Sequence, residues 1–196
     1  MRTAIFADLH DNEEALLRVL EDAARQGADK LIFLGDAGRS PQILDLLRER
    51  AVACTFGNWE IGQLDQLPPA QREWVAAWPA TLRDGDALFC HATPQQPPAI
   101  HTAADVAALR AAGGDWLRLF PRLDRHEQAV WDALAVMEEE RLRVVFHGHT
   151  HVQAGWIWQA DGAGRRQLHS FHGLDEIELA PGPAVAPTRY LIGVGS

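Results

Sequence analysis

The first third of the chain alternates short apolar runs with longer segments whose apolar residues recur every three to four positions. The runs have the length of buried strands, and the longer segments have the periodicity of amphipathic helices. Strands are predicted at 3–7, 30–34 and 52–56, with one helix over 13–26 and another that begins near Pro41. Because strand–helix–strand units connect parallel strands, this part predicts a parallel sheet in an α/β fold.

The rest of the chain predicts further strands separated by helices. A hairpin is expected over 82–88, a strand at 142–146, a second hairpin at 153–158 and 166–171 around a turn at 161–164, and a last strand at 188–194. Helical periodicity covers 70–77 and much of 103–140. We interpret residues 1–196 as one domain with a helical insert at about 100–141, and we hypothesise a truncated C-terminus because no turn or helix follows the last strand.

Composition and charge narrow the class of protein. A hydrophobic content of 47% with 23% charged residues is ordinary for a soluble domain. The apolar runs are too short for a membrane helix and the N-terminus lacks a signal-peptide pattern. Cys54 and Cys90 fall in predicted buried strands, so a reducing, cytoplasmic location is expected. A net charge of −9 without a Lys/Arg cluster disfavours nucleic acid as a partner. The oligomeric state stays open.

Side chains that ligate metals follow five of the predicted strands, at or just beyond the point where each strand ends. In an open α/β sheet, sites assemble outside the carboxyl ends of the strands. A shell of His, Asp and Asn without thiolate suits Mn, Fe, Zn or Mg and not a structural zinc site. The set is large enough for two ions that share one carboxylate, and its members are Asp8, His10, Asp36, Asn58, His91, His149 and His151.

A pair of ions would polarise a phosphoryl group and lower the pKa of a shared water. No nucleophile elbow or phosphate-binding Gly-rich loop with a Lys competes with this interpretation. Each block also has a structural interpretation when it is taken alone. Asp8 and His10 can cap the following helix, and Gly35-Asp36 can be a plain turn.

The order of the blocks resembles the calcineurin-like metallophosphoesterase superfamily, in which D-x-H, G-D-x-x, G-N-H-[DE], a lone H and G-H-x-H follow one another. Here the blocks are Asp8-Leu9-His10, Gly35-Asp36-Ala37-Gly38, Gly57-Asn58-Trp59-Glu60, His91 and Gly148-His149-Thr150-His151. The resemblance spans residues 3–152 and is nearest to the small bacterial phosphodiesterase branch. It implies a four-layered α/β/β/α sandwich of two mixed β-sheets. It also implies hydrolysis of a small phosphodiester or phosphomonoester by metal-activated water, with a phosphodiesterase favoured.

The same resemblance implies a role for each ligand. Asp8, His10 and His151 bind one divalent ion, Asn58, His91 and His149 bind the other, and Asp36 bridges them. Asp36, Asn58 and His91 are therefore expected to take part in catalysis. Manganese is the expected metal, with Fe, Zn, Ni or Mg as alternatives.

Trp59 departs from the family pattern, which has a His that contacts phosphate and protonates the leaving group. An indole donates a hydrogen bond but transfers no proton. Because general acid catalysis contributes about 10²–10⁴-fold, we expect activated diesters to react better than alkyl monoesters. Trp59 and Arg39 are the expected substrate contacts, and the alternative for Arg39 is solvent exposure or pairing near the following helix. His101 and His126 in the insert are interpreted as surface residues, and either one is also a candidate substitute acid.

Trp59 and the abrupt C-terminus also fit a non-catalytic scaffold or interaction module, although a complete ligand set argues against a pure scaffold. Glu60 is expected to organise the surroundings of the ligands without binding metal. His147 is interpreted equally as a support for the ligands or as a surface residue.

Overall fold

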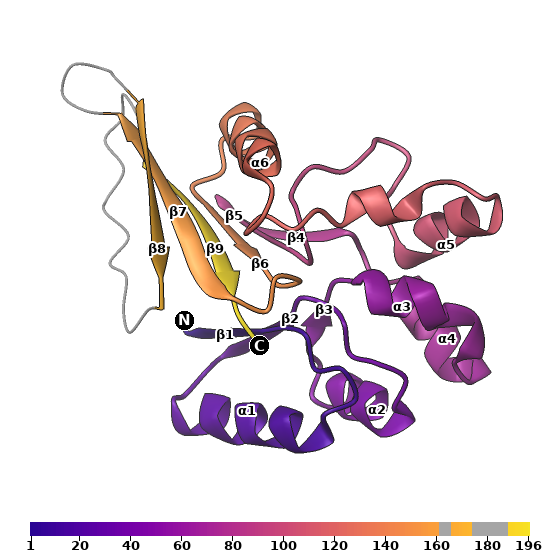
Figure 1. The fold of residues 1–196 in the computed structure, drawn as a ribbon. Coiled ribbons are helices and arrows are strands. Elements are labelled where there is room, and N and C mark those ends of the chain that lie inside the picture. Colours follow the sequence, from indigo (N-terminus) through magenta and orange to yellow (C-terminus); the bar gives the residue numbers. More distant parts are fainter. Residues whose placement is uncertain (161–165, 174–187) are drawn as a thin grey trace.

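The first sheet lies in the lower half of the molecule in Figure 1 and contains three parallel strands. The computed structural model describes residues 1–160, 166–173 and 188–196. In spatial order the strands are β1 (Thr3–Phe6), β2 (Lys30–Phe33) and β3 (Ala53–Cys54). Their register aligns Phe6 with Phe33 and Phe33 with Cys54, so all three carboxyl ends meet at one edge.

Two helices cover the outer face of this sheet and begin at the residues that the sequence predicts. α1 (Glu13–Arg25) is capped by Asn12, whose side chain accepts the N–H of Ala15 at 3.0 Å. α2 (Pro41–Glu49) has proline at its first position, behind the capping side chain of Ser40. Both helices bury an aliphatic stripe against the sheet in the largest core cluster.

The second sheet is mixed and has six strands in the order β4-β5-β6-β9-β7-β8. β5, β6 and β9 are parallel to one another, whereas β4, β7 and β8 are joined to the sheet by antiparallel pairing. The strands are β4 (Thr81–Asp84), β5 (Ala87–Cys90), β6 (Val144–His147), β7 (Gln153–Ala160), β8 (Arg166–His172) and β9 (Arg189–Val194).

The two sheets pack face to face, with helices outside each of them (Figure 1). Between the sheets lies an apolar cluster that includes Ile32 of β2, Leu34 directly after β2, and Phe89 of the second sheet. α6 (Glu127–Glu139) covers the outer face of the second sheet through a separate cluster. This is the predicted four-layered α/β/β/α sandwich, with the difference that the first sheet, in its described strands, is entirely parallel and not mixed.

The remaining helices lie at one end of the sandwich, beside the carboxyl ends of the first sheet (Figure 1). They are α3 (Asn58–Gln63), the 3-10 segment η1 (Leu64–Gln66), α4 (Pro69–Ala76), α5 (Ala103–Ala111) and η2 (Trp116–Leu119). The insert predicted at about 100–141 thus contains α5, η2 and α6. The sequence did not predict α3, and the strand predicted at 52–56 is confined to two residues.

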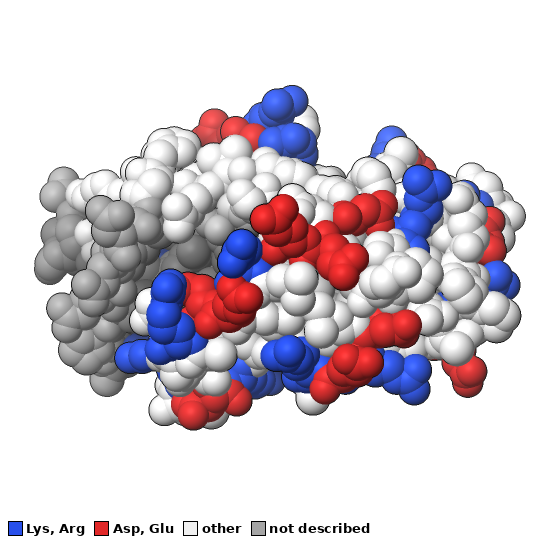
Figure 2. Space-filling model, turned by 90° about the horizontal axis from the view of Figure 1, so that it is seen from below, with Lys and Arg blue, Asp and Glu red and all other residues white. Residues whose placement is uncertain are grey.

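The turn predicted at 161–164 lies outside the described residues. Within the part that is described, no helix has the length and apolar character needed to cross a bilayer. On the face seen in Figure 2, acidic and basic side chains are intermixed, with no continuous basic surface of the kind that binds a nucleic acid backbone.

Candidate metal centre

Five of the seven predicted ligands have a left-handed backbone, which is uncommon for residues other than glycine. Their φ angles are 57° at Asp8, 46° at His10, 64° at Asp36, 63° at His149 and 60° at His151. All five lie in loops that leave β1, β2 or β6. Such conformations cost free energy and tend to occur at functional sites, where the surrounding structure enforces them.

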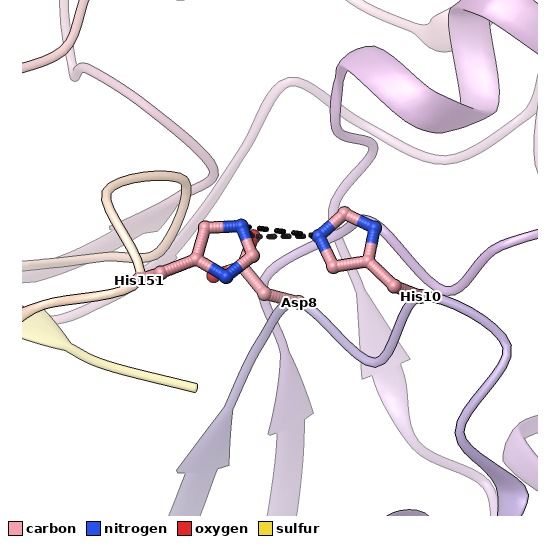
Figure 3. A group of neighbouring side chains, drawn as sticks. All are labelled: Asp8, His10 and His151. Atoms are coloured by element: carbon pink, nitrogen blue, oxygen red, sulfur yellow. Dashed lines mark hydrogen bonds and ion pairs between the residues drawn. The ribbon is translucent and has the colours of Figure 1, made fainter.

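The first group of ligands consists of Asp8, His10 and His151. Figure 3 shows the two imidazoles pointing toward each other beside the carboxylate of Asp8. The Nε2 atoms of His10 and His151 are 3.1 Å apart, and they lie 4.0 Å and 3.7 Å from Asp8 Oδ1. The rings are nearly parallel, with an interplanar angle of 7°. Two nitrogens and an oxygen therefore converge on one point.

The second group consists of Asp36, His91 and His149, with Asn58 beside it. Nε2 of His91 is 3.4 Å from Asp36 Oδ2 and 3.2 Å from Asn58 Oδ1. The rings of His91 and His149 are 5.0 Å apart. Nδ1 of His91 donates a hydrogen bond of 2.7 Å to the carbonyl of Leu34, so Nε2 is the nitrogen left for a metal.

Asp36 connects the two groups through one carboxylate oxygen. Its Oδ2 lies 3.4 Å from Nε2 of His91 in the second group and 3.9 Å from Nε2 of His10 in the first. Its other oxygen, Oδ1, accepts the N–H of Trp59 at 2.8 Å. The carboxylate is thus held on one side by the backbone and faces both groups on the other, as a bridging ligand would.

The buried carboxylates of the two ligand groups favour the binding of a cation. Asp8 and Asp36 are both buried, and burial raises the pKa of Asp8, to which the charge of Asp36 adds. Burial opposes ionisation of Asp36 and of His91, but their mutual attraction prevails: it lowers the pKa of Asp36 and raises that of His91 to about 9. Buried carboxylates need a compensating positive charge, and divalent ions would supply it.

The donor set therefore fits two divalent ions. Within each group of three, the ligand atoms lie within 4.8 Å of one another. The donors are carboxylate oxygens and imidazole nitrogens, which suit Mn, Fe, Zn or Ni better than they suit a soft metal. Asn58 adds an amide oxygen beside His91.

Glu60 holds two backbone segments around the site through three hydrogen bonds. Its carboxylate accepts the N–H of Asp36 at 2.9 Å, of Ala37 at 2.7 Å and of Gly57 at 2.7 Å. The residue is 1% exposed, and burial followed by the charge of Asp36 raises its pKa to about 7. This geometry agrees with the supporting role expected for Glu60, because each hydrogen bond fixes a loop that carries a predicted ligand.

Gly57 permits the close approach of two predicted ligands. A Cβ atom built on Gly57 would overlap Oδ1 of Asp36 and would lie 2.8 Å from Cε1 of His91. Gly35, with φ +97°, packs equally closely against the backbone of Gly57. The glycines of the two motifs therefore bring the loops after β2 and β3 into direct contact.

The two predicted substrate contacts lie in different environments. The indole of Trp59 packs edge-on against the ring of His10, with centroids 4.6 Å apart. Arg39 is exposed, and its backbone N–H donates to Asp11 Oδ1 at 2.6 Å. Within the described residues, its guanidinium makes no hydrogen bond or ion pair with the predicted ligands. Trp59 is thus placed at the site, and the role of Arg39 stays a prediction.

The other histidines differ in placement. His101 and His126 are exposed, and in the part of the chain described here neither ring is hydrogen-bonded or ion-paired with the predicted ligands. His147 is 1% exposed, which favours a support role over a surface one. Its Nδ1 donates to the carbonyl of Gly148 at 3.0 Å, and its ring stacks on Trp156.

Sequence reasoning missed two supports of the site. Asp11 accepts the N–H groups of Arg39 and Ser40 through Oδ1, which ties the loop after β1 to the loop after β2. Its position one residue beyond the Asp-x-His block was the available signal. Phe120 packs against the rings of His91 and His149 at centroid distances of 5.8 Å and 6.2 Å. Nothing in its sequence surroundings marks it.

Comparison with known proteins is consistent with this geometry. A family model described as the calcineurin-like phosphoesterase superfamily domain matches residues 1–165. Among solved structures, a metallophosphoesterase from Sphaerobacter thermophilus is similar over 100% of this chain and 77% of that chain, with 22% identity and a TM-score of 0.59. No curated protein sequence matches. The structural likeness confirms the fold, and the family match over most of the length shows that the chain belongs to the calcineurin-like phosphoesterase superfamily.

Proposed function

We propose that the protein is a dinuclear metal-dependent phosphoesterase that hydrolyses a small phosphodiester. Membership of the superfamily implies a hydrolase. The observation that carries the two-metal proposal is the position of Asp36 Oδ2, which faces His91 of one ligand group and His10 of the other. Two ions, one in each group, would give this shared oxygen the role of a bridging ligand.

The chain's own residues prepare the site for this chemistry. When bound, two divalent ions supply Lewis-acid polarisation of a phosphoryl oxygen and an activated water. Glu60 fixes the loops that carry Asp36 and Asn58, so the ligands are held in place before substrate arrives. The hydrogen bond from His91 to the carbonyl of Leu34 sets its ring orientation and directs Nε2 toward Asp36.

A preference for diesters with good leaving groups follows from Trp59. Its indole occupies the space beside His10 and transfers no proton. The absence of a general acid therefore lowers the rate of hydrolysis least for a substrate whose leaving group departs without protonation. Among the described residues, the exposed rings of His101 and His126 have no contact with the ligands that would let either one replace the missing acid.

A hollow beside the first ligand group suits a small substrate. It has a volume of about 600 Å³, and Asp8 and His151 form part of its wall. Leu9, Val194 and Gln153 line it further on, so the wall is largely aliphatic with a few polar groups. This volume is in the range of pockets that bind small molecules.

Hydrolysis of bis-p-nitrophenyl phosphate with Mn²⁺ tests the proposal. We expect metal-dependent turnover by the unmodified protein and a loss of at least about 100-fold in Asp36→Asn, because removal of a ligand costs no less than removal of a support residue. Asp22→Asn on α1, whose side chain is 52% exposed, is the matched control and is expected to retain activity. Turnover no greater than that of Asp36→Asn would instead favour the non-catalytic scaffold.

A further inference from the structure

The segment that follows η2 lies directly against the second ligand group. Phe120 is buried and its ring contacts those of His91 and His149. The position of Phe120 relative to both ligands is therefore fixed by packing.

Arg122 extends from this segment to the loop between the last two predicted ligands. Its Nη2 donates to the carbonyl of Thr150 at 2.8 Å, and Thr150 stands between His149 and His151. Asp124 accepts from Nε at 3.1 Å and from Nη2 at 2.9 Å. These bonds fix the plane of the guanidinium at the edge of the site.

One terminal nitrogen of the guanidinium is left for another partner. Nη1 of Arg122 has no hydrogen-bond partner among the described residues, and the side chain is 33% exposed. A guanidinium with a fixed plane and a free N–H edge is suited to an oxyanion, because it binds at a small cost in conformational entropy.

The guanidinium of Arg122 lies beside both ligand groups. The carbonyl that it contacts belongs to Thr150, which stands between His149 of the second group and His151 of the first. The hydrogen bond to Asp124 raises the pKa of Arg122, burial opposes this, and the charges of Asp124 and Asp8 add to the increase. A positive charge is therefore held next to both groups.

We propose that Arg122 is a substrate-contacting residue whose free Nη1–H binds a non-bridging oxygen of the substrate phosphoryl group. The inference rests on the proposed phosphoesterase function and adds to it a cation that Trp59 cannot supply. Arg122 binds the phosphoryl group without donating a proton to the leaving group, so it strengthens substrate binding and leaves the preference for good leaving groups intact. If its role were purely structural, Arg122 would only link residues 120–124 to the carbonyl of Thr150 and would not contact the substrate.

Calorimetric binding of inorganic phosphate to the Mn²⁺-loaded protein separates these roles and requires no turnover. Arg122→Gln is expected to weaken phosphate binding at least tenfold while the number of bound ions is unchanged. Arg122→Lys is expected to recover part of the affinity, because it restores the charge without the planar fork. Arg125→Gln is the matched control: it removes the same charge from the same segment, its side chain is 68% exposed, and it is expected to stay within twofold of the unmodified protein.

Several results would overturn the proposal. Unchanged phosphate affinity in Arg122→Gln excludes the contact, and so does a loss that Arg125→Gln reproduces. If phosphate affinity falls in Arg122→Gln and in Arg122→Lys, and both variants also bind fewer metal ions, Arg122 has a structural role. Absence of turnover in the unmodified protein would overturn the proposed function alone, since phosphate binding is measured independently.

Discussion

The contact between Gly57 and two predicted ligands makes Gly57→Ala a sharp perturbation of the site. The backbone of Gly57, with φ −115° and ψ −175°, accepts any residue, so the substitution introduces no torsional strain. The added methyl would instead overlap Asp36 Oδ1 and would lie 2.8 Å from Cε1 of His91. Its effect is therefore steric and falls on the carboxylate that is proposed to bridge the ions.

The size of the effect follows from these distances. Carbon atoms in contact are about 3.5 Å apart, so His91 or the backbone of Gly57 must move by roughly 0.7 Å, and Asp36 must move further. Overpacking of this kind costs about 1–3 kcal/mol of folding free energy. A displacement near 1 Å in a catalytic arrangement costs about 100-fold in rate. We expect activity to fall much more than stability.

Gly62→Ala is the matched control, because Gly62 lies in α3, the helix that Gly57 directly precedes, and an added Cβ meets no atom within 4 Å. It is expected to raise the free energy of unfolding by about 0.4–1 kcal/mol and to leave activity unchanged. Urea unfolding, Mn²⁺ titration and turnover of bis-p-nitrophenyl phosphate are measured on both variants. If Gly57→Ala bound two ions with unmodified affinity and kept its turnover, the steric reasoning and the assignment of Asp36 would be refuted.

Three further predictions concern the surroundings of the ligands. Trp59→His is expected to raise turnover of alkyl diesters, by about 100-fold or more, and that of activated diesters much less; an equal gain for both would contradict the missing-acid argument. Glu60→Ala is expected to lower the free energy of urea unfolding by at least about 1–3 kcal/mol, because it leaves three buried N–H groups without their acceptor; unchanged stability would be contrary evidence. Burial lowers the pKa of His147 from 6.5 to about 4. Between these two pH values the unfolded chain binds a proton at His147 and the folded chain does not, so stability falls as the pH drops from 6.5 to 4. His147→Leu in metal-free protein is expected to remove up to about 3 kcal/mol of this loss, and an unaltered pH dependence would show that His147 does not cause it.

The sequence predicted those parts of the fold that local patterns determine. The sequence predicted helices from residue 13 and from near Pro41, and the structure begins both there. The first helix had Asp11 and Asn12 as candidate caps, and the structure shows Asn12 in that position. The resemblance to the superfamily was recognised from the order of the ligand-bearing blocks, each of which follows a predicted strand. The pairing of Asp8 with His151, which are far apart in the sequence, came from the family resemblance and not from any local signal.

Other features depend on tertiary contacts that no local pattern reports. α3 was missed because residues 57–60 carry the polar and glycine residues of a loop, while the helix is held by the buried carboxylate of Glu60. The short β3 ends because the N–H of Phe56 donates to the carbonyl of Pro79, although the N–H of Thr55 still donates to Phe33 of β2. Arg122 lies in a segment without periodicity, and only the folded chain brings it to the carbonyl of Thr150.

Anomalous scattering from a crystal of the Mn²⁺-loaded protein tests the central claim most directly. The account predicts two Mn²⁺ ions per chain, one bound by Asp8, His10 and His151 and the other by His91, His149 and Asn58, with Asp36 in contact with both. A single ion, or two ions of which only one contacts Asp36, would contradict the bridging assignment and with it the dinuclear mechanism.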